Sequence, residues 1–162
     1  GCATTAVDEM GDASTYEFLY TNYLTGDVFL ATASRTLTKL EVEAMGDLTG
    51  QSIHWAIYSS ASKAGPYTPE FDVITPGGPA GFQSSGTIAA SLTAGRYYLA
   101  AVQLASSGYY YLYRSAALTP SMSFGQPVGW LSANGAAGVL PASVSNVSPI
   151  AASFHFRFTT KP

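Results

Sequence analysis

Residues 92–114 constrain the fold most, because they contain the two strongest strand patterns in the chain. Thr93-Ala94-Gly95 predicts a tight turn, and residues 96–104 follow as a strand of aromatic and aliphatic side chains. A second turn at residues 106–108 precedes another aromatic strand, residues 109–114. Because side chains alternate across a strand, the first strand is apolar on both faces, which suits the middle of a sandwich or a subunit contact. We therefore predict a β-hairpin at the centre of an all-β domain.

Other short segments with strand character follow one another along the chain, separated by Gly, Pro and Ser. In Thr36 to Ala44, three apolar residues alternate with three charged ones, which is typical of a strand with one face in water. Ser153 to Thr160 places three phenylalanines on one face. Near the start of the chain, Gly26-Asp27 should break the aromatic strand expected at Tyr16 to Tyr23. We predict an all-β fold, a two-sheet antiparallel β-sandwich that is jelly-roll-like, with about nine or ten strands and no substantial helix.

The length of 162 residues suits one domain with a full hydrophobic core. Residues 1–15 are small, polar and acidic without a clear period, so we predict an N-terminal arm there, as an inter-subunit strand or a linker. Residues 16–162 then form a single sandwich. Cys2 is the one cysteine, which excludes an intrachain disulfide and leaves lipidation, a cross-link between subunits or an inert thiol.

The chain carries few charges. Charged residues make up 10% of it, against about 25% in an average soluble protein, while 47% are hydrophobic and 13% aromatic. Such a chain either exposes uncharged surface or buries it against other chains, so we expect a homo-oligomer or polymer. No apolar run is long enough to span a membrane.

Acidic and basic residues are unevenly distributed. The first 50 residues hold eight acids and two bases, whereas no acid follows Asp72. This favours either head-to-tail association of subunits or pairing of the two signs within one fold. The net charge of −3 and the lack of a basic cluster argue against nucleic acid as a partner.

Catalytic chemistry finds no support in the sequence, and we expect no enzyme. Glu41 and Glu43 lie on the outer face of one strand rather than flanking a substrate bond. No Gly-x-Ser-x-Gly turn is present, and His54 and His155 fall in strand patterns. A zinc site would need clustered His and Cys, which this sequence, with one Cys and two His, lacks. Calcium has only weak candidate ligands without a twelve-residue loop, namely Asp8, Glu9 and Asp12.

Four short pieces follow one another between about residues 25 and 160: Thr36 to Gly46, Ile57-Tyr58-Ser59 followed by Gly65-Pro66-Tyr67, the segment SLTAGRYYLAAV, and Val139 to Ala142. In this order they resemble a jelly-roll-like β-sandwich module found in bacteriophage tail and fibre proteins and in secreted bacterial surface proteins. The resemblance implies a non-enzymatic structural or attachment module and supplies no catalytic residues.

We therefore expect a structural subunit of an extracellular assembly, such as a filament, fibre or virion appendage, located outside the cell, on its surface or in a virion. It would associate through apolar sandwich surfaces and N-terminal strand addition. The expected assembly residues are Cys2, Val7, Tyr16, Phe18 and Tyr20. The alternative is a carbohydrate-binding adhesion module that binds cell-surface glycans through loops 60–81 and 115–135. Its candidate ligand or interface aromatics are Tyr67, Tyr109, Tyr111, Tyr113 and Trp130.

Overall fold

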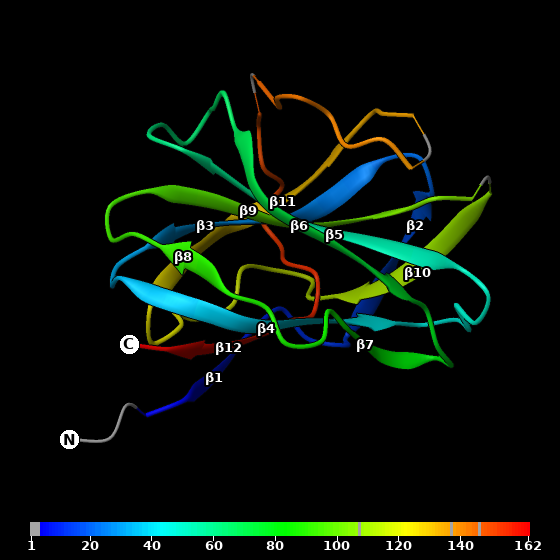
Figure 1. The fold of residues 1–162 in the computed structure, drawn as a ribbon, viewed down its shortest axis with the longest axis horizontal. Coiled ribbons are helices and arrows are strands. Elements are labelled where there is room, and N and C mark those ends of the chain that lie inside the picture. The colour runs from blue at the N-terminus through cyan, green and yellow to red at the C-terminus, as the bar shows by residue number, and fades with distance from the viewer. Residues whose placement is uncertain (1–3, 107, 137, 146) are drawn as a thin grey trace.

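The computed structural model describes residues 4–106, 108–136, 138–145 and 147–162, and these form two antiparallel β-sheets packed face to face (Figure 1). No helix occurs in the described residues, which confirms the predicted fold class. The strands are β1 (Ala6–Met10), β2 (Thr15–Tyr20), β3 (Leu24–Ala31), β4 (Arg35–Ala44), β5 (Ser52–Ser60), β6 (Thr68–Pro76), β7 (Gly81–Ser84), β8 (Ala90–Leu92), β9 (Tyr97–Leu104), β10 (Tyr109–Arg114), β11 (Gly125–Ala133) and β12 (Phe156–Lys161).

The first sheet has seven strands in the order β1-β12-β4-β10-β2, with β7 and β8 also paired to β4. The second has five strands in the order β11-β3-β9-β5-β6. In Figure 1 the five-stranded sheet lies above the seven-stranded one, and both chain ends lie at the same side of the molecule. Strand β9 is therefore the central strand of its sheet, as its two apolar faces predict.

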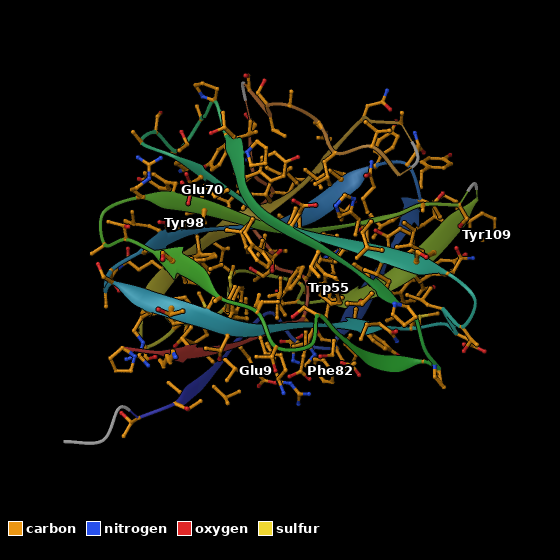
Figure 2. All side chains as sticks on the ribbon, in the orientation of Figure 1. Glu9, Trp55, Glu70, Phe82, Tyr98 and Tyr109 are labelled. Carbon is orange, nitrogen blue, oxygen red and sulfur yellow. The ribbon has the colours of Figure 1, made fainter. Side chains whose placement is uncertain are left out.

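The main core lies between the two sheets. Phe154, Phe156 and Phe158 alternate along the last segment and are all fully buried, as predicted. Their rings meet aromatic side chains from the opposite sheet, including Phe29, which lies 5.4 Å from Phe158 between ring centroids. Figure 2 shows Trp55 between the sheets. This close packing of large rings holds the sandwich together.

A second, smaller core covers the outer face of the five-stranded sheet. Residues 139–145, together with Val147, lie across this face, drawn in orange above the sheet in Figure 1. They bury the outward side chains of the central strands, among them Tyr58 and Leu99. Burial raises the pKa of Tyr58 to about 12, and its hydroxyl donates to the Pro141 carbonyl. Both faces of β5 and β9 are thus removed from water, which explains why neither strand alternates with polar residues.

The predicted central hairpin is wrong. Strands β9 and β10 belong to different sheets, so the segment between them crosses the sandwich rather than reversing one ladder. Strand β9 pairs with β3 and β5, whereas β10 pairs with β2 and β4. A short turn between two apolar strands looks the same in sequence in both arrangements.

The predicted strand break at Gly26-Asp27 is also wrong, and the strand count of nine or ten is too low. Strand β3 runs through both residues. Gly26 lies against the neighbouring strand, where a Cβ atom would meet the Ala100 carbonyl oxygen at 2.0 Å. A glycine here serves close backbone approach instead of a turn. The additional strands are short ones, β1, β7 and β8.

Strands β1 and β2 are the two terminal strands in the order of the seven-stranded sheet. Strand β1 pairs with β12, and β2 pairs with β10, with only residues 11–14 between them. Residues 6–10 of the predicted arm therefore lie in the sheet of their own chain, and Met10 is fully buried in the main core. These two strands carry most of the candidate assembly residues.

Candidate functional site: an exposed aromatic face

The side chains that point away from the core on β2 and β10 are all aromatic. The antiparallel register places Tyr16 opposite Tyr113, Phe18 opposite Tyr111 and Tyr20 opposite Tyr109. Since alternate residues of a strand share a face, these side chains form three cross-strand pairs on one surface. We call this surface the aromatic face; it comprises Tyr16, Phe18, Tyr20, Tyr109, Tyr111 and Tyr113.

The aromatic face is open to solvent although its rings touch one another. Side-chain burial leaves Tyr16 51%, Phe18 45%, Tyr20 54% and Tyr109 62% exposed. The ring of Phe18 lies 4.9 Å from Tyr109 and 5.7 Å from Tyr111 between centroids. Tyr109 is labelled at the far end of the molecule in Figure 2, away from both chain termini. The rings therefore form one continuous surface rather than isolated exposed residues.

The opposite sides of the same two strands fix this surface in place. Leu19, Tyr110 and Leu112 point into the main core and are buried. Burial raises the pKa of the Tyr110 hydroxyl well above its usual range. Beside them, the Arg114 guanidinium donates to the Glu17 carboxylate over 3.0 Å. The face is thus held on a rigid sheet, and rigid rings lose little entropy on binding.

The remainder of the same outer surface carries several paired charged side chains. Arg157 donates to Glu41, which also pairs with Lys39 over 3.1 Å, and the Arg157 guanidinium lies over the Phe82 ring. Burial alone would raise the pKa of Glu41, but the two cations hold it below its usual range. His155 contacts both Glu43 and Glu9 through its two ring nitrogens. Figure 2 shows Glu9 and Phe82 on this side of the sandwich.

The two halves of this surface therefore differ in chemistry. On one half, Glu41 pairs with Lys39 and Arg157, and Glu9 and Glu43 pair with His155. Acids and bases from distant segments therefore pair within one fold at these positions. The aromatic face offers apolar ring area with phenolic hydroxyls and no charged catalytic group. Such a surface can pack against another protein or stack on sugar rings.

Two predicted ligand aromatics lie elsewhere and are not displayed. Tyr67 is fully buried in the second core, and its hydroxyl donates to the Lys63 carbonyl over 2.8 Å. Trp130 is partly buried, and its ring packs edge-on against Phe154 at 5.2 Å. Tyr67 therefore presents no free face, and Trp130 presents only part of one. This packing could not be predicted locally, because the residues that cover the two rings are distant from them in sequence. Much of loops 60–81 and 115–135, which were expected to bind glycans, is strand: β6 lies in the first and β11 in the second.

The calcium candidates are separated by their hydrogen bonds. Asp8 accepts from the backbone and hydroxyl of Ser123. Asp12 accepts from the Ser14 N–H, and hydrogen bonding with the side chain of Ser14, followed by this backbone bond, lowers the pKa of Asp12. Glu9 turns to His155 instead. Within the described residues, no group of three or more His, Cys, Asp or Glu side chains could hold a metal ion.

The other predicted assembly residues have different positions. Val7 is exposed on β1, which pairs with β12 and not with the strands of the aromatic face. Cys2 lies outside the described residues.

Sequence reasoning missed two contributors close to the aromatic face. Tyr23 follows β2, with its ring 5.7 Å from Tyr20. Met45 follows β4, is exposed, and its N–H donates to the Tyr111 carbonyl. The signal for Met45 was available, since it continues the alternation past Ala44 onto the outer face.

No protein-family model, curated protein or solved structure matches this chain. None of the described residues forms a helix of the length and apolar character that crossing a membrane requires.

Proposed function

We propose that this protein is a non-enzymatic structural subunit of an extracellular assembly, such as a filament, fibre or virion appendage, and that it self-associates through the aromatic face. The observation that carries this proposal is the continuous set of six aromatic side chains on β2 and β10, four of them about half exposed. Tyrosine and phenylalanine are enriched at the centres of protein interfaces.

The size of the surface supports this role. Large aromatic side chains bury about 150–250 Å² each, so four half-exposed rings present roughly 300–500 Å² of coverable surface. The largest contiguous apolar patch of a typical monomer covers about 300–600 Å² and is often functional. With only 10% charged residues in the chain, few charges surround the patch to keep subunits apart.

The finer identification, a jelly-roll-like module of phage tail or bacterial surface proteins, belongs to this proposal. It accords with the two-sheet sandwich and places the assembly outside the cell, on its surface or in a virion. Strand addition by the N-terminal arm would here take the form of an exchange of β1 between subunits, because β1 pairs with β12 of its own chain in the monomer.

Particle mass and shape test the structural role. Light scattering and negative-stain electron microscopy of the intact protein, with and without reductant, should reveal particles heavier than one 16.9 kDa chain. Loss of particles on reduction would assign Cys2 a covalent role. A monomer under all conditions would refute the structural role.

Glycan binding is the second candidate, and the same exposed tyrosines favour it, since aromatic rings stack on sugar faces. On a glycan array, Tyr109→Ala should then weaken binding while leaving the fold intact, because the Tyr109 ring is exposed. Tyr67→Ala is unsuitable for this test, because the Tyr67 ring belongs to the second core. Absence of any bound glycan would remove this candidate.

A further inference from the structure

Strand β2 ends the seven-stranded sheet with an open backbone edge. The carbonyl oxygens of Tyr111 and Tyr113 accept from Met45 and His155, so these residues direct their backbone away from β2. The pairs Tyr111–Phe18 and Tyr113–Tyr16 are therefore the non-hydrogen-bonded pairs of the ladder. The backbone N–H and C=O groups of Phe18 and Tyr16 consequently point away from β10, toward the open side of β2. No turn or side-chain hydrogen bond among the described residues reaches these outward groups.

The other described sheet edges are protected. Strand β6 carries Pro69 and Pro76 with two acids, and β11 contains Pro127 and a bulge. The bulged strand is also covered where Trp130 and Ile150 exchange backbone hydrogen bonds. These are the devices by which proteins prevent edge-to-edge pairing.

The edges of β1, β7 and β8 are closed in other ways. Residues 119–123 lie beside β1, since the Thr119 hydroxyl accepts from Gly11 and Asp8 binds Ser123. Strands β7 and β8 contain only four and three residues. Among the described edge strands of five or more residues, β2 alone has no proline, no bulge, no covering segment and no unpaired charge, because Glu17 is bound by Arg114.

We propose that a second copy of this chain pairs with β2 through its own β2, antiparallel and about a two-fold axis at Phe18. This inference rests on the proposed self-association and names its contact. Phe18 then lies opposite Phe18 of the other copy, and Tyr16 opposite Tyr20. Tyr20, opposite Tyr109, also directs its backbone outward, and its carbonyl already accepts from the Tyr23 N–H. Four hydrogen bonds form from the other outward groups: each Phe18 N–H to the other Phe18 carbonyl, and each Tyr20 N–H to the other Tyr16 carbonyl.

The pairing joins the two aromatic faces into one. Residues opposite each other in a ladder point to the same side, so the rings of the two copies become neighbours across the axis. Three half-exposed rings on each β2 give roughly 450–750 Å² for both copies. With the strand backbone added, the contact belongs to the weak, reversible interfaces below about 1,200 Å². The edge is electrically neutral, so two copies do not repel.

The contact is isologous and therefore closes on itself as a pair. A filament would need a second, different contact as well. The pairing by itself predicts a reversible monomer–dimer equilibrium, with dimers increasing at higher protein concentration.

A single cysteine at the axis tests the register. In a Cys2→Ser background, Phe18→Cys would place two thiols on residues about 5.5 Å apart between Cα atoms, and a short bifunctional thiol reagent should cross-link them into dimers. Tyr16→Cys is the matched control on the same strand, because its copies would be about 14 Å apart between Cα atoms. Tyr111→Cys is the control on β10, because face-to-face packing of two aromatic faces would favour it instead.

Dimer cross-linking several-fold faster for Phe18→Cys than for both controls supports the two-fold pairing. Equal rates, or faster cross-linking of Tyr111→Cys, would overturn it. The chain with Phe18→Pro provides a second test, because it loses the outward N–H but no bond within its own sheet. This variant should stay folded by circular dichroism and sediment as a monomer.

The same measurements separate this contact from the wider proposal. If Phe18→Pro still forms wild-type particles, β2 pairing is wrong while self-association stands. If the wild type sediments as a monomer at every concentration, both are wrong.

Discussion

At the level of single residues, Asp27 is the most unusual polar group in the core. It is fully buried on β3, and one carboxylate oxygen accepts from the Phe154 N–H over 2.9 Å while the other has no partner among the described residues. Burial raises the pKa of this carboxyl well above its usual value, against the smaller opposing effect of that hydrogen bond. A neutral acid accordingly suits this position.

The raised pKa makes stability depend on pH. A carboxyl whose folded-state pKa exceeds its unfolded value of about 3.9 contributes its full stabilisation below that value and loses it as pH rises through the folded-state pKa. Asp27→Asn keeps an oxygen for Phe154 and cannot ionise. Its free energy of unfolding relative to wild type should therefore increase between about pH 4 and pH 8 in urea titrations. Parallel pH profiles for both proteins would show that Asp27 does not titrate in this way.

Gly26 is required for space rather than for an unusual backbone angle. Gly26→Ala should lower the free energy of unfolding by roughly 1–3 kcal/mol, because the new methyl group would displace strand β9 at Ala100. Gly46→Ala is the matched control, since a Cβ atom there meets nothing within 4 Å. Thermal unfolding of the two variants compares them directly, and equal melting temperatures would refute the close approach.

At the level of elements, β1 is an integral strand although its sequence looks like a polar arm. Met10→Ala should destabilise the fold by about 2–5 kcal/mol, because Met10 fills the main core. Val7→Ala on the same strand should cost less than about 0.5 kcal/mol, because Val7 is exposed. Urea unfolding measures both. A small effect of Met10→Ala would instead indicate that β1 detaches readily from its own sheet.

The strands themselves were largely predictable, but their partners were not. Alternation located β4 and the phenylalanines of the last segment, because one face of each is buried. Nothing local distinguishes a hairpin from a crossing between sheets, so β9 and β10 were paired wrongly. Tyr67 was misplaced for a related reason: the second core that buries it is built from residues distant in sequence.

At the level of the whole molecule, the sandwich separates three kinds of surface. One face of the five-stranded sheet is covered by its own chain, half of the seven-stranded sheet carries paired charges, and the other half is the aromatic face. The sequence predicted the aromatic residues as two separate groups, one for assembly and one for ligands. Only the register of β2 with β10 unites them, and register is a long-range property.

Sedimentation velocity over a wide range of protein concentrations tests self-association through the aromatic face most directly. The comparison uses the wild type, the double variant Phe18→Ser/Tyr109→Ser, and Ile74→Ser, which removes an exposed apolar side chain from β6 on the other sheet. We predict that the wild type and Ile74→Ser form species heavier than one chain as concentration rises, while the double variant remains a folded monomer. Identical sedimentation of all three proteins would contradict a role of the aromatic face in assembly.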